Sequence, residues 1–266
     1  SGLAFGASIR ADNAAGGASG DAGEVFISGA FGKLSMGDVD GAAQMATGNV
    51  AGVGYVGIGD LNESTFLGAG DGVTDPTALY EYSAGDFTVY LSATNPQYAN
   101  GTATTRTEDL SAVAIGAKYT FGDYSVGLGF ENLSGYRGAI GVLAFPVADN
   151  IDLDHVVLKV SANVAGFNIQ GLIGQADGDA SGLATGGAAA GTTVLNNAKQ
   201  YAMSVGYTVD ALSGTVFYTD DSALLGSTAY GIGASYDLGG AAISGGIVKN
   251  VDTKETGFDL GITMSF

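Results

Sequence analysis

Residues 257–266 at the end of the chain read GFDLGITMSF and alternate between large apolar side chains and small or polar ones. The apolar positions are Phe258, Leu260, Ile262, Met264 and Phe266. Successive side chains of a β-strand point to opposite faces of the sheet, so this segment predicts a strand with one apolar face and one wet face. The direction in which the apolar face points decides the class of the fold.

The same period of two recurs along the whole chain, in fourteen segments. They begin near Leu3, Glu24, Lys33, Ala78, Phe87, Leu110, Tyr124, Asp154, Phe167, Lys199, Leu212, Thr228, Ala241 and Glu255. Helical spacing fits none of them as well, and the 46 glycines argue against long helices. The sequence therefore predicts an all-β, antiparallel fold that forms one domain over residues 1–266.

The connections between these segments alternate between short and long. Tight turns such as FGDY at 121–124 and DLGG at 237–240 alternate with long, polar, glycine-rich stretches, of which 38–77 is the longest. Short turns at one end of the strands and long loops at the other are typical of outer-membrane β-barrels. Aromatic residues gather on the turn side, which predicts a girdle at one membrane interface. The girdle residues are Phe31, Tyr82, Phe87, Phe121, Tyr124, Phe167, Tyr207, Tyr236 and Phe266.

The composition indicates which way the apolar faces point. Charged residues make up 14% of the chain, against roughly 25% in an average soluble domain. The second face of each strand carries Gly, Ala, Ser, Thr or Asn, which suit a wet lumen better than a hydrophobic core, so the apolar faces point to lipid. No run approaches the ~18 apolar residues of a membrane-spanning helix. We therefore expect a transmembrane β-barrel in the bacterial outer membrane.

Charge and residue counts exclude several functions. The net charge is −18 with nine Lys and Arg, so nucleic acid is not an expected partner, because phosphates require basic residues. Cysteine is absent and His155 is the one histidine, which we expect at the rim or in the lumen. Asp152 and Asp154 lie beside it, but the sequence holds no nucleophile with a base and an orienting group, so an enzyme is not expected.

Several stretches resemble the general diffusion porins of photosynthetic and related α-proteobacteria. They are GLAFGASIRAD (2–12), VFISGAFGKLSMGD (25–38), YEYSAGDFTVYLSA (80–93), AAISGGIV (241–248) and DLGITMSF (259–266). The resemblance covers nearly the whole chain. It implies a water-filled outer-membrane channel for passive diffusion of ions and small hydrophilic solutes, assembled as a homotrimer. It also implies that the terminal Phe266 is a signal for the outer-membrane assembly machinery.

The family barrel has sixteen strands, and the similarity here starts at what would be its third strand. Two alternatives follow. Either the sequence lacks the first N-terminal hairpin of the family, or it closes as a barrel of fourteen strands, since an even number is allowed in both cases.

The family folds one long loop into the lumen as a constriction, and the resemblance assigns this role to 38–77. The carboxylates of this loop are Asp38, Asp40, Asp60, Glu63, Asp71 and Asp75, and it has no Lys or Arg. Strand parity directs four basic side chains into the lumen: Arg10, Lys33, Lys118 and Lys159. In the family, acidic loop residues face a basic wall, which implies a transverse field across the narrowest part.

The net charge of −18 predicts a weak preference for cations. An alternative function is a plugged or structural outer-membrane barrel whose acidic loops bind ions, lipopolysaccharide or a surface partner. Outer-membrane lipid and lipopolysaccharide are expected partners in either case. No cofactor is expected, although the clustered loop carboxylates leave Ca²⁺ as an open alternative, since Ca²⁺ takes several oxygen ligands.

Overall fold

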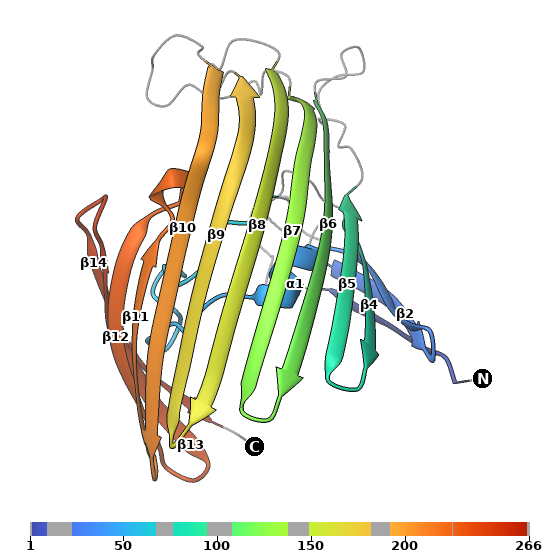
Figure 1. Cartoon of the computed structure of the whole chain (residues 1–266). Helices are drawn as coiled ribbons and strands as arrows, with labels where there is room; N and C mark the ends of the chain where they lie inside the picture. The colour runs from blue at the N-terminus through green and yellow to red at the C-terminus, as the bar shows by residue number, and fades with distance from the viewer. Residues whose placement is uncertain are drawn as a thin grey trace.

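The computed structural model describes residues 2–9, 23–67, 77–94, 108–137, 149–181, 192–224 and 226–264. These residues form one sheet of fourteen strands in chain order, each antiparallel to the next, as Figure 1 shows. The strands are β1 (Ala4–Ile9), β2 (Gly23–Gly29), β3 (Gly32–Gly37), β4 (Thr77–Ala84), β5 (Phe87–Thr94), β6 (Glu108–Phe121), β7 (Tyr124–Arg137), β8 (Asp149–Val164), β9 (Phe167–Ser181), β10 (Thr192–Val209), β11 (Leu212–Asp220), β12 (Thr228–Asp237), β13 (Ala241–Asn250) and β14 (Thr256–Met264). The predicted number and order of strands in the described chain are confirmed.

The strands near the long loops are longer than the sequence predicted. β8 begins at Asp149 instead of near Asp154, and β10 begins at Thr192 instead of near Lys199. Pairing between β7 and β8 continues to the outermost pair, Arg137 with Asp149. The backbone ladder therefore extends beyond the apolar alternation, because its hydrogen bonds need no apolar side chains.

The sheet is strongly curved, and its concave side encloses the segment 38–67 (Figure 1). The middle strands, β6 to β10, form the tallest part of the wall. β1 and β14 are the two edges of the sheet, and the described residues contain no pairing between them. Thus the pairing that would close fourteen strands into a ring is not among the pairings described.

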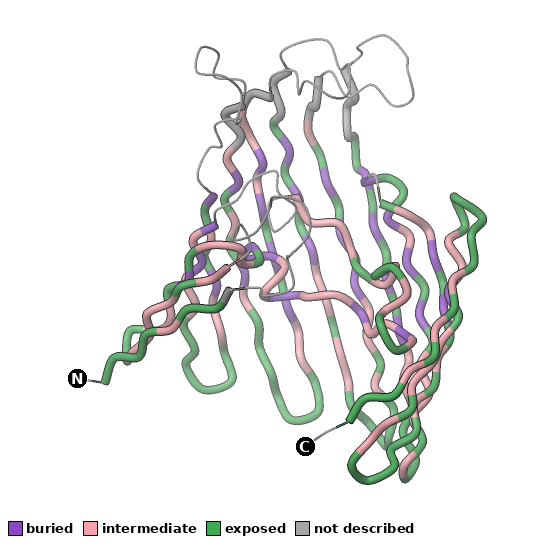
Figure 2. The backbone as a smooth tube through the Cα atoms, turned by 180° about the vertical axis from the view of Figure 1, so that it is seen from behind, coloured by how far each residue is buried: buried purple, intermediate pink, exposed green. Residues whose placement is uncertain are grey.

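The two faces of the sheet differ as the alternation predicted. On the terminal strand Phe258 and Leu260 point outward and are 81% and 78% exposed, whereas Asp259 between them points inward to the enclosed segment. No helix in the described part of the chain is long and apolar enough to cross a membrane. Figure 2, seen from behind, shows that buried residues are concentrated where the wall lies against 38–67.

Aromatic side chains are exposed at the short turns, where the girdle was predicted. Phe121 stacks between Tyr119 and Tyr124, with ring centroids 5.6 and 5.5 Å apart, and Phe167 meets Tyr207 at 4.5 Å. Phe266 lies outside the described residues. Such rings suit a membrane interface, where apolar surface and polar groups lie side by side.

A short helix inside the sheet was not predicted. α1 (Ala42–Thr47) packs against the inner faces of β5, β6 and β7. Its close approach depends on glycines in the wall: a Cβ added to Gly116 would lie 2.2 Å from the Ala42 carbonyl oxygen, and one added to Gly127 would lie 2.2 Å from that of Ala46. The small residues of β6 and β7 therefore form the seat of the helix.

We predict that Gly127→Ala destabilises the protein, because the new methyl group must displace the backbone of α1. The expected cost is about 1–3 kcal/mol, as for overpacking of a well-filled interior. Urea unfolding in detergent micelles measures it. Gly171→Ala is the matched control, since a Cβ there meets nothing closer than 3.9 Å and the same residue change alters the unfolded chain equally. Equal unfolding midpoints for the two variants would contradict this packing.

Candidate functional site

The segment 38–67 crosses the interior from β5 to β14 on three apolar contacts. The first is α1, with Ala42 and Ala46 against Leu79 and Tyr90. In the second, Val50 packs with Val157, Leu172 and Ala202; in the third, Val53 packs with Phe217, Ala229 and Val248. At the far end the ring of Tyr55 lies over Gly261, where an added Cβ would be 2.3 Å from the ring. The small inward residues of the terminal strand thus give room to the enclosed segment.

Side chains of the wall satisfy the backbone of this segment. The Asp259 carboxylate accepts the N–H groups of Tyr55 and Val56, each at 2.7 Å. The other ties are Ala42 N–H to Ser92 Oγ at 2.8 Å, Ala51 N–H to Ser204 Oγ at 3.1 Å, Thr219 Oγ1 to the Leu61 carbonyl at 2.8 Å, and Lys159 Nζ to the Asn49 carbonyl. Because buried backbone groups must be paired, these ties fix the course of the segment through the interior.

A row of buried polar side chains holds the last part of the segment. Glu131, His155, Gln200 and Asp221 are between 0% and 4% exposed. Glu131 Oε1 accepts the N–H of Leu67 at 2.7 Å, and Asp221 Oδ2 accepts that of Thr65.

The expectation that His155 lies at the rim or in the lumen is wrong, since it is completely buried in the wall beneath the loop. Parity indicated its inward direction, but only the docked loop shows that it is covered.

The free face of the segment is acidic. Asp40, Asp60 and Glu63 line a recess of about 520 Å³ together with Gln44 and Asn49. Desolvation by the surrounding protein raises the pKa of Asp40, and the neighbouring carboxylate of Asp38 raises it further. The structure therefore brings four of the six predicted loop carboxylates to one segment inside the sheet. Asp71 and Asp75 lie outside the described residues.

The predicted basic residues are divided between two places. Lys118 and Lys159 lie on the inner faces of β6 and β8, close enough to repel each other. Lys33 lies nearer the short turns, where its ammonium group is 2.8 Å from Glu24 Oε1 and 4.7 Å from the centre of the Phe26 ring. Its charge is therefore compensated locally. Arg10 lies outside the described residues.

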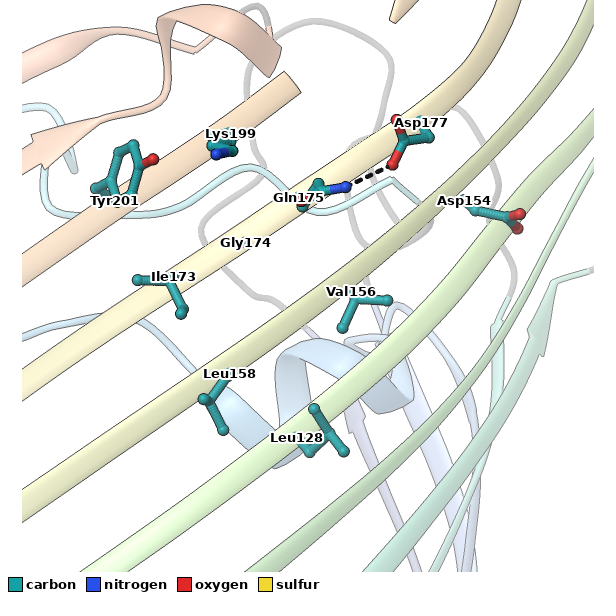
Figure 3. Close-up of a pocket in the computed structure, with 10 residues that line it drawn as sticks. All are labelled: Leu128, Asp154, Val156, Leu158, Ile173, Gly174, Gln175, Asp177, Lys199 and Tyr201. Carbon is teal, nitrogen blue, oxygen red and sulfur yellow. Dashed lines mark hydrogen bonds between the residues drawn. The ribbon is translucent and has the colours of Figure 1, made fainter. Parts of the chain in front are cut away.

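A second hollow, of about 600 Å³, lies on the outward face of β7 to β10 (Figure 3). Its apolar part includes Leu128, Leu158 and Ile173, and its rim carries Asp154, Gln175, Asp177 and Lys199. The exposed apolar side chains that line it belong to the same outward face as Phe258 and Leu260. This hollow therefore belongs to the lipid side of the wall and not to the interior.

Known proteins match this arrangement along the whole chain. A family model described as Gram-negative porin matches residues 1–256. The chain belongs to the Gram-negative porin family. A porin from Rhodobacter capsulatus is 36% identical over 275 residues, covering 100% of this chain and 88% of the relative. Membership of this family makes the protein an outer-membrane channel protein.

Solved structures support the fold. A porin structure superposes with a TM-score of 0.76 at 32% identity, covering 99% of this chain and 87% of the other. A variant of the Rhodopseudomonas blastica porin gives a TM-score of 0.60 at 22% identity, covering 100% and 85%. The resemblance inferred from the sequence is thus confirmed at the level of family, fold and membrane.

Metal binding at the acidic loops stays a prediction. The described residues contain no group of three or more His, Cys, Asp or Glu side chains placed to hold an ion.

We predict that Asp259→Ala loosens the far end of the enclosed segment, because Tyr55 and Val56 lose their common acceptor. Chymotrypsin cleavage after Tyr55 should become about threefold faster, since local opening exposes the backbone. Asp252→Ala is the control. Asp252 lies in the turn between β13 and β14 and also accepts a backbone N–H at 2.7 Å, that of Thr228 at the start of β12. Unchanged cleavage at Tyr55 would show that the carboxylate does not hold the segment.

Proposed function

We propose that this porin is a passive diffusion channel with a weak preference for cations, constricted by the loop 38–77. Ions and small hydrophilic solutes would pass the free, acidic face of the described segment 38–67. The observation that carries the proposal is the acidic recess on a segment that the wall holds across the interior at three apolar contacts. Carboxylates that line a narrow aqueous passage raise the local concentration of cations and lower that of anions.

The basic residues support a weak preference and not a strong one. The positive charge of Lys33 is compensated by the Glu24 carboxylate, and the Lys159 ammonium group donates a hydrogen bond to the Asn49 carbonyl. Lys118 and Lys159 nevertheless add positive charge to the wall against which α1 packs. The acidic loop face and this basic wall are the parts from which a transverse field would arise.

Three further proposals rest on the family resemblance. The channel assembles as a homotrimer, the terminal Phe266 is read by the outer-membrane assembly machinery, and the outward face contacts outer-membrane lipid and lipopolysaccharide. The hollow of Figure 3, with an apolar part and a polar rim, is compatible with a lipid neighbour.

We predict that neutralising the recess reduces the cation preference. The triple variant Asp40→Asn, Asp60→Asn, Glu63→Gln should shift the reversal potential in a salt gradient toward zero, because three negative charges leave the passage. Single-channel recording in a planar bilayer measures it. The control variant Asp86→Asn, Asp123→Asn, Asp210→Asn removes the same charge at exposed short turns and should leave the potential unchanged.

An equal shift in both triple variants would place the selectivity in the overall charge and not in the constriction. No conductance steps from correctly folded protein would instead favour the plugged-barrel alternative.

We predict that the cation preference begins to weaken at a higher pH than exposed aspartates alone would give. The raised pKa of Asp40 means that this carboxylate becomes neutral at a higher pH than an ordinary aspartate, whose pKa is about 3.9. The first loss of preference should therefore begin above the range in which exposed aspartates protonate. Reversal potentials recorded across the acidic range test this, and Asp40→Asn should lower the pH at which the loss begins.

A further inference from the structure

The buried row Glu131, His155, Gln200 and Asp221 has a role beyond lining the wall. It runs inside the wall from β7 across β8 and β10 to the residue that follows β11, and both of its ends bind the backbone of the loop. Glu131 holds Leu67, and Asp221 holds Thr65. His155 lies in the middle of the row and contacts both Glu131 and Gln200, and its ring is tilted against that of Phe66 at a centroid distance of 6.2 Å. The state of this ring therefore bears on the position of the loop.

The orientation of the Gln200 amide is fixed by its surroundings. Its Nε2 donates to Asp221 Oδ1 at 2.8 Å and to the Thr65 carbonyl at 3.2 Å. Both partners are acceptors only, so the reversed amide would place its oxygen against two other oxygens. Consequently it is Gln200 Oε1 that faces His155 Nε2 at 2.5 Å.

Both ring nitrogens of His155 thus face oxygen acceptors. Nδ1 lies 2.7 Å from Glu131 Oε1, which also accepts the N–H of Leu67, and Nε2 lies against Gln200 Oε1. Each contact needs a proton, and a neutral imidazole carries only one. Nε2 must therefore be protonated, and a second proton must lie between Nδ1 and Glu131. Together the pair holds one proton more than a carboxylate and a neutral imidazole would.

We infer that His155 is a positioning residue of the constriction loop, and that in the folded channel its ring carries the extra proton on Nδ1, as an imidazolium that faces the Glu131 carboxylate. Among the described residues, the charged groups that face the ring and its hydrogen-bond partners are acidic. Glu131 touches it directly from β7, Asp221 faces it through Gln200, and the loop brings Asp40, Asp60 and Glu63 to the recess that Asp221 and Phe66 also line. The one cation near it on β8, Lys159, directs its ammonium group to the Asn49 carbonyl. Carboxylates on several sides stabilise a positive charge placed among them.

Loss of the proton in alkaline solution would remove one of the two hydrogen bonds that His155 makes to Glu131 and Gln200. One ring nitrogen would then face an acceptor without a hydrogen, and the buried charge of Glu131 would lose its partner, which is costly in a site shielded from water. His155 would then no longer fix the side chains of Gln200 and Glu131 relative to each other. The backbone at Thr65 and Leu67 would be held less firmly as a result. The consequence for conduction rests on the proposed function, whereas the protonation state does not.

The protonation state has a direct test, since the chain contains one histidine. Protein labelled with ¹⁵N-histidine and folded in detergent micelles gives ring-nitrogen signals from His155 alone. At neutral pH both ring nitrogens of the folded protein should show one-bond couplings to hydrogen. A single protonated nitrogen in the folded protein at neutral pH would overturn the inference. This measurement needs no variant and no conductance.

The positioning role is tested by channel recordings against pH. Wild-type open-channel noise should rise severalfold from neutral to alkaline solution. His155→Gln, whose two N–H donors lie on one nitrogen and not on opposite sides of a ring, should show the higher noise throughout. Thr94→Val is the control, because Thr94 is a buried polar residue of the wall that binds only the neighbouring strand at Ala112. Noise in His155→Gln that follows the wild type at every pH would overturn the role, as would an equal change in Thr94→Val. A folded wild type without conductance would defeat the proposed function, and the histidine signals would still decide the proton.

Discussion

The constraint on which this structure depends is that every backbone N–H and C=O group inside hydrocarbon must find a partner within the protein. Fourteen antiparallel strands in chain order meet this condition along each shared ladder. Because the ladder itself needs no apolar side chains, the sequence is free to alternate. One set of residues faces lipid, as Phe258 and Leu260 do, and the other faces the interior. The low charge content and the many small residues follow from this division.

The same constraint governs the loop inside the sheet, in a different form. A segment without ladder partners would leave its backbone groups unpaired, and here the wall supplies side chains to meet them, from Ser92 on β5 to Asp259 on β14. Small residues matter as much as polar ones. Gly127 lets α1 lie directly on the wall, and Gly261 makes room for Tyr55. The position of the enclosed segment is therefore a property of the wall and the loop together.

Two groups of charged side chains lie in different surroundings inside the sheet: carboxylates at the recess and the buried Glu131–His155 pair. In the proposed channel, the carboxylates that line the recess would act on ions in the aqueous passage. The inferred role of the Glu131–His155 pair is to position the loop from a buried site, where an unpaired charge or a missing proton costs far more than at the surface. An acidic channel thus carries its single histidine where a positive charge has carboxylates around it.

The sequence by itself determined the strands, their order, the outward direction of the apolar face and the identity of the long loop. Alternation and turn length are local signals. They were sufficient for the strand order because each strand pairs with the next one along the chain. Tertiary structure alone decided what the loop touches. Parity could place Lys33 and Lys159 on the inner face. It could not show that Lys33 pairs with Glu24, or that Lys159 donates a hydrogen bond to the Asn49 carbonyl. It could likewise point His155 inward without showing that the loop covers it. The Lys33–Glu24 pair depends on side-chain conformations that parity does not give. The cover over His155 and the contact of Lys159 with Asn49, 110 positions away, depend on which distant backbone lies across the strand, and no period within a strand records that.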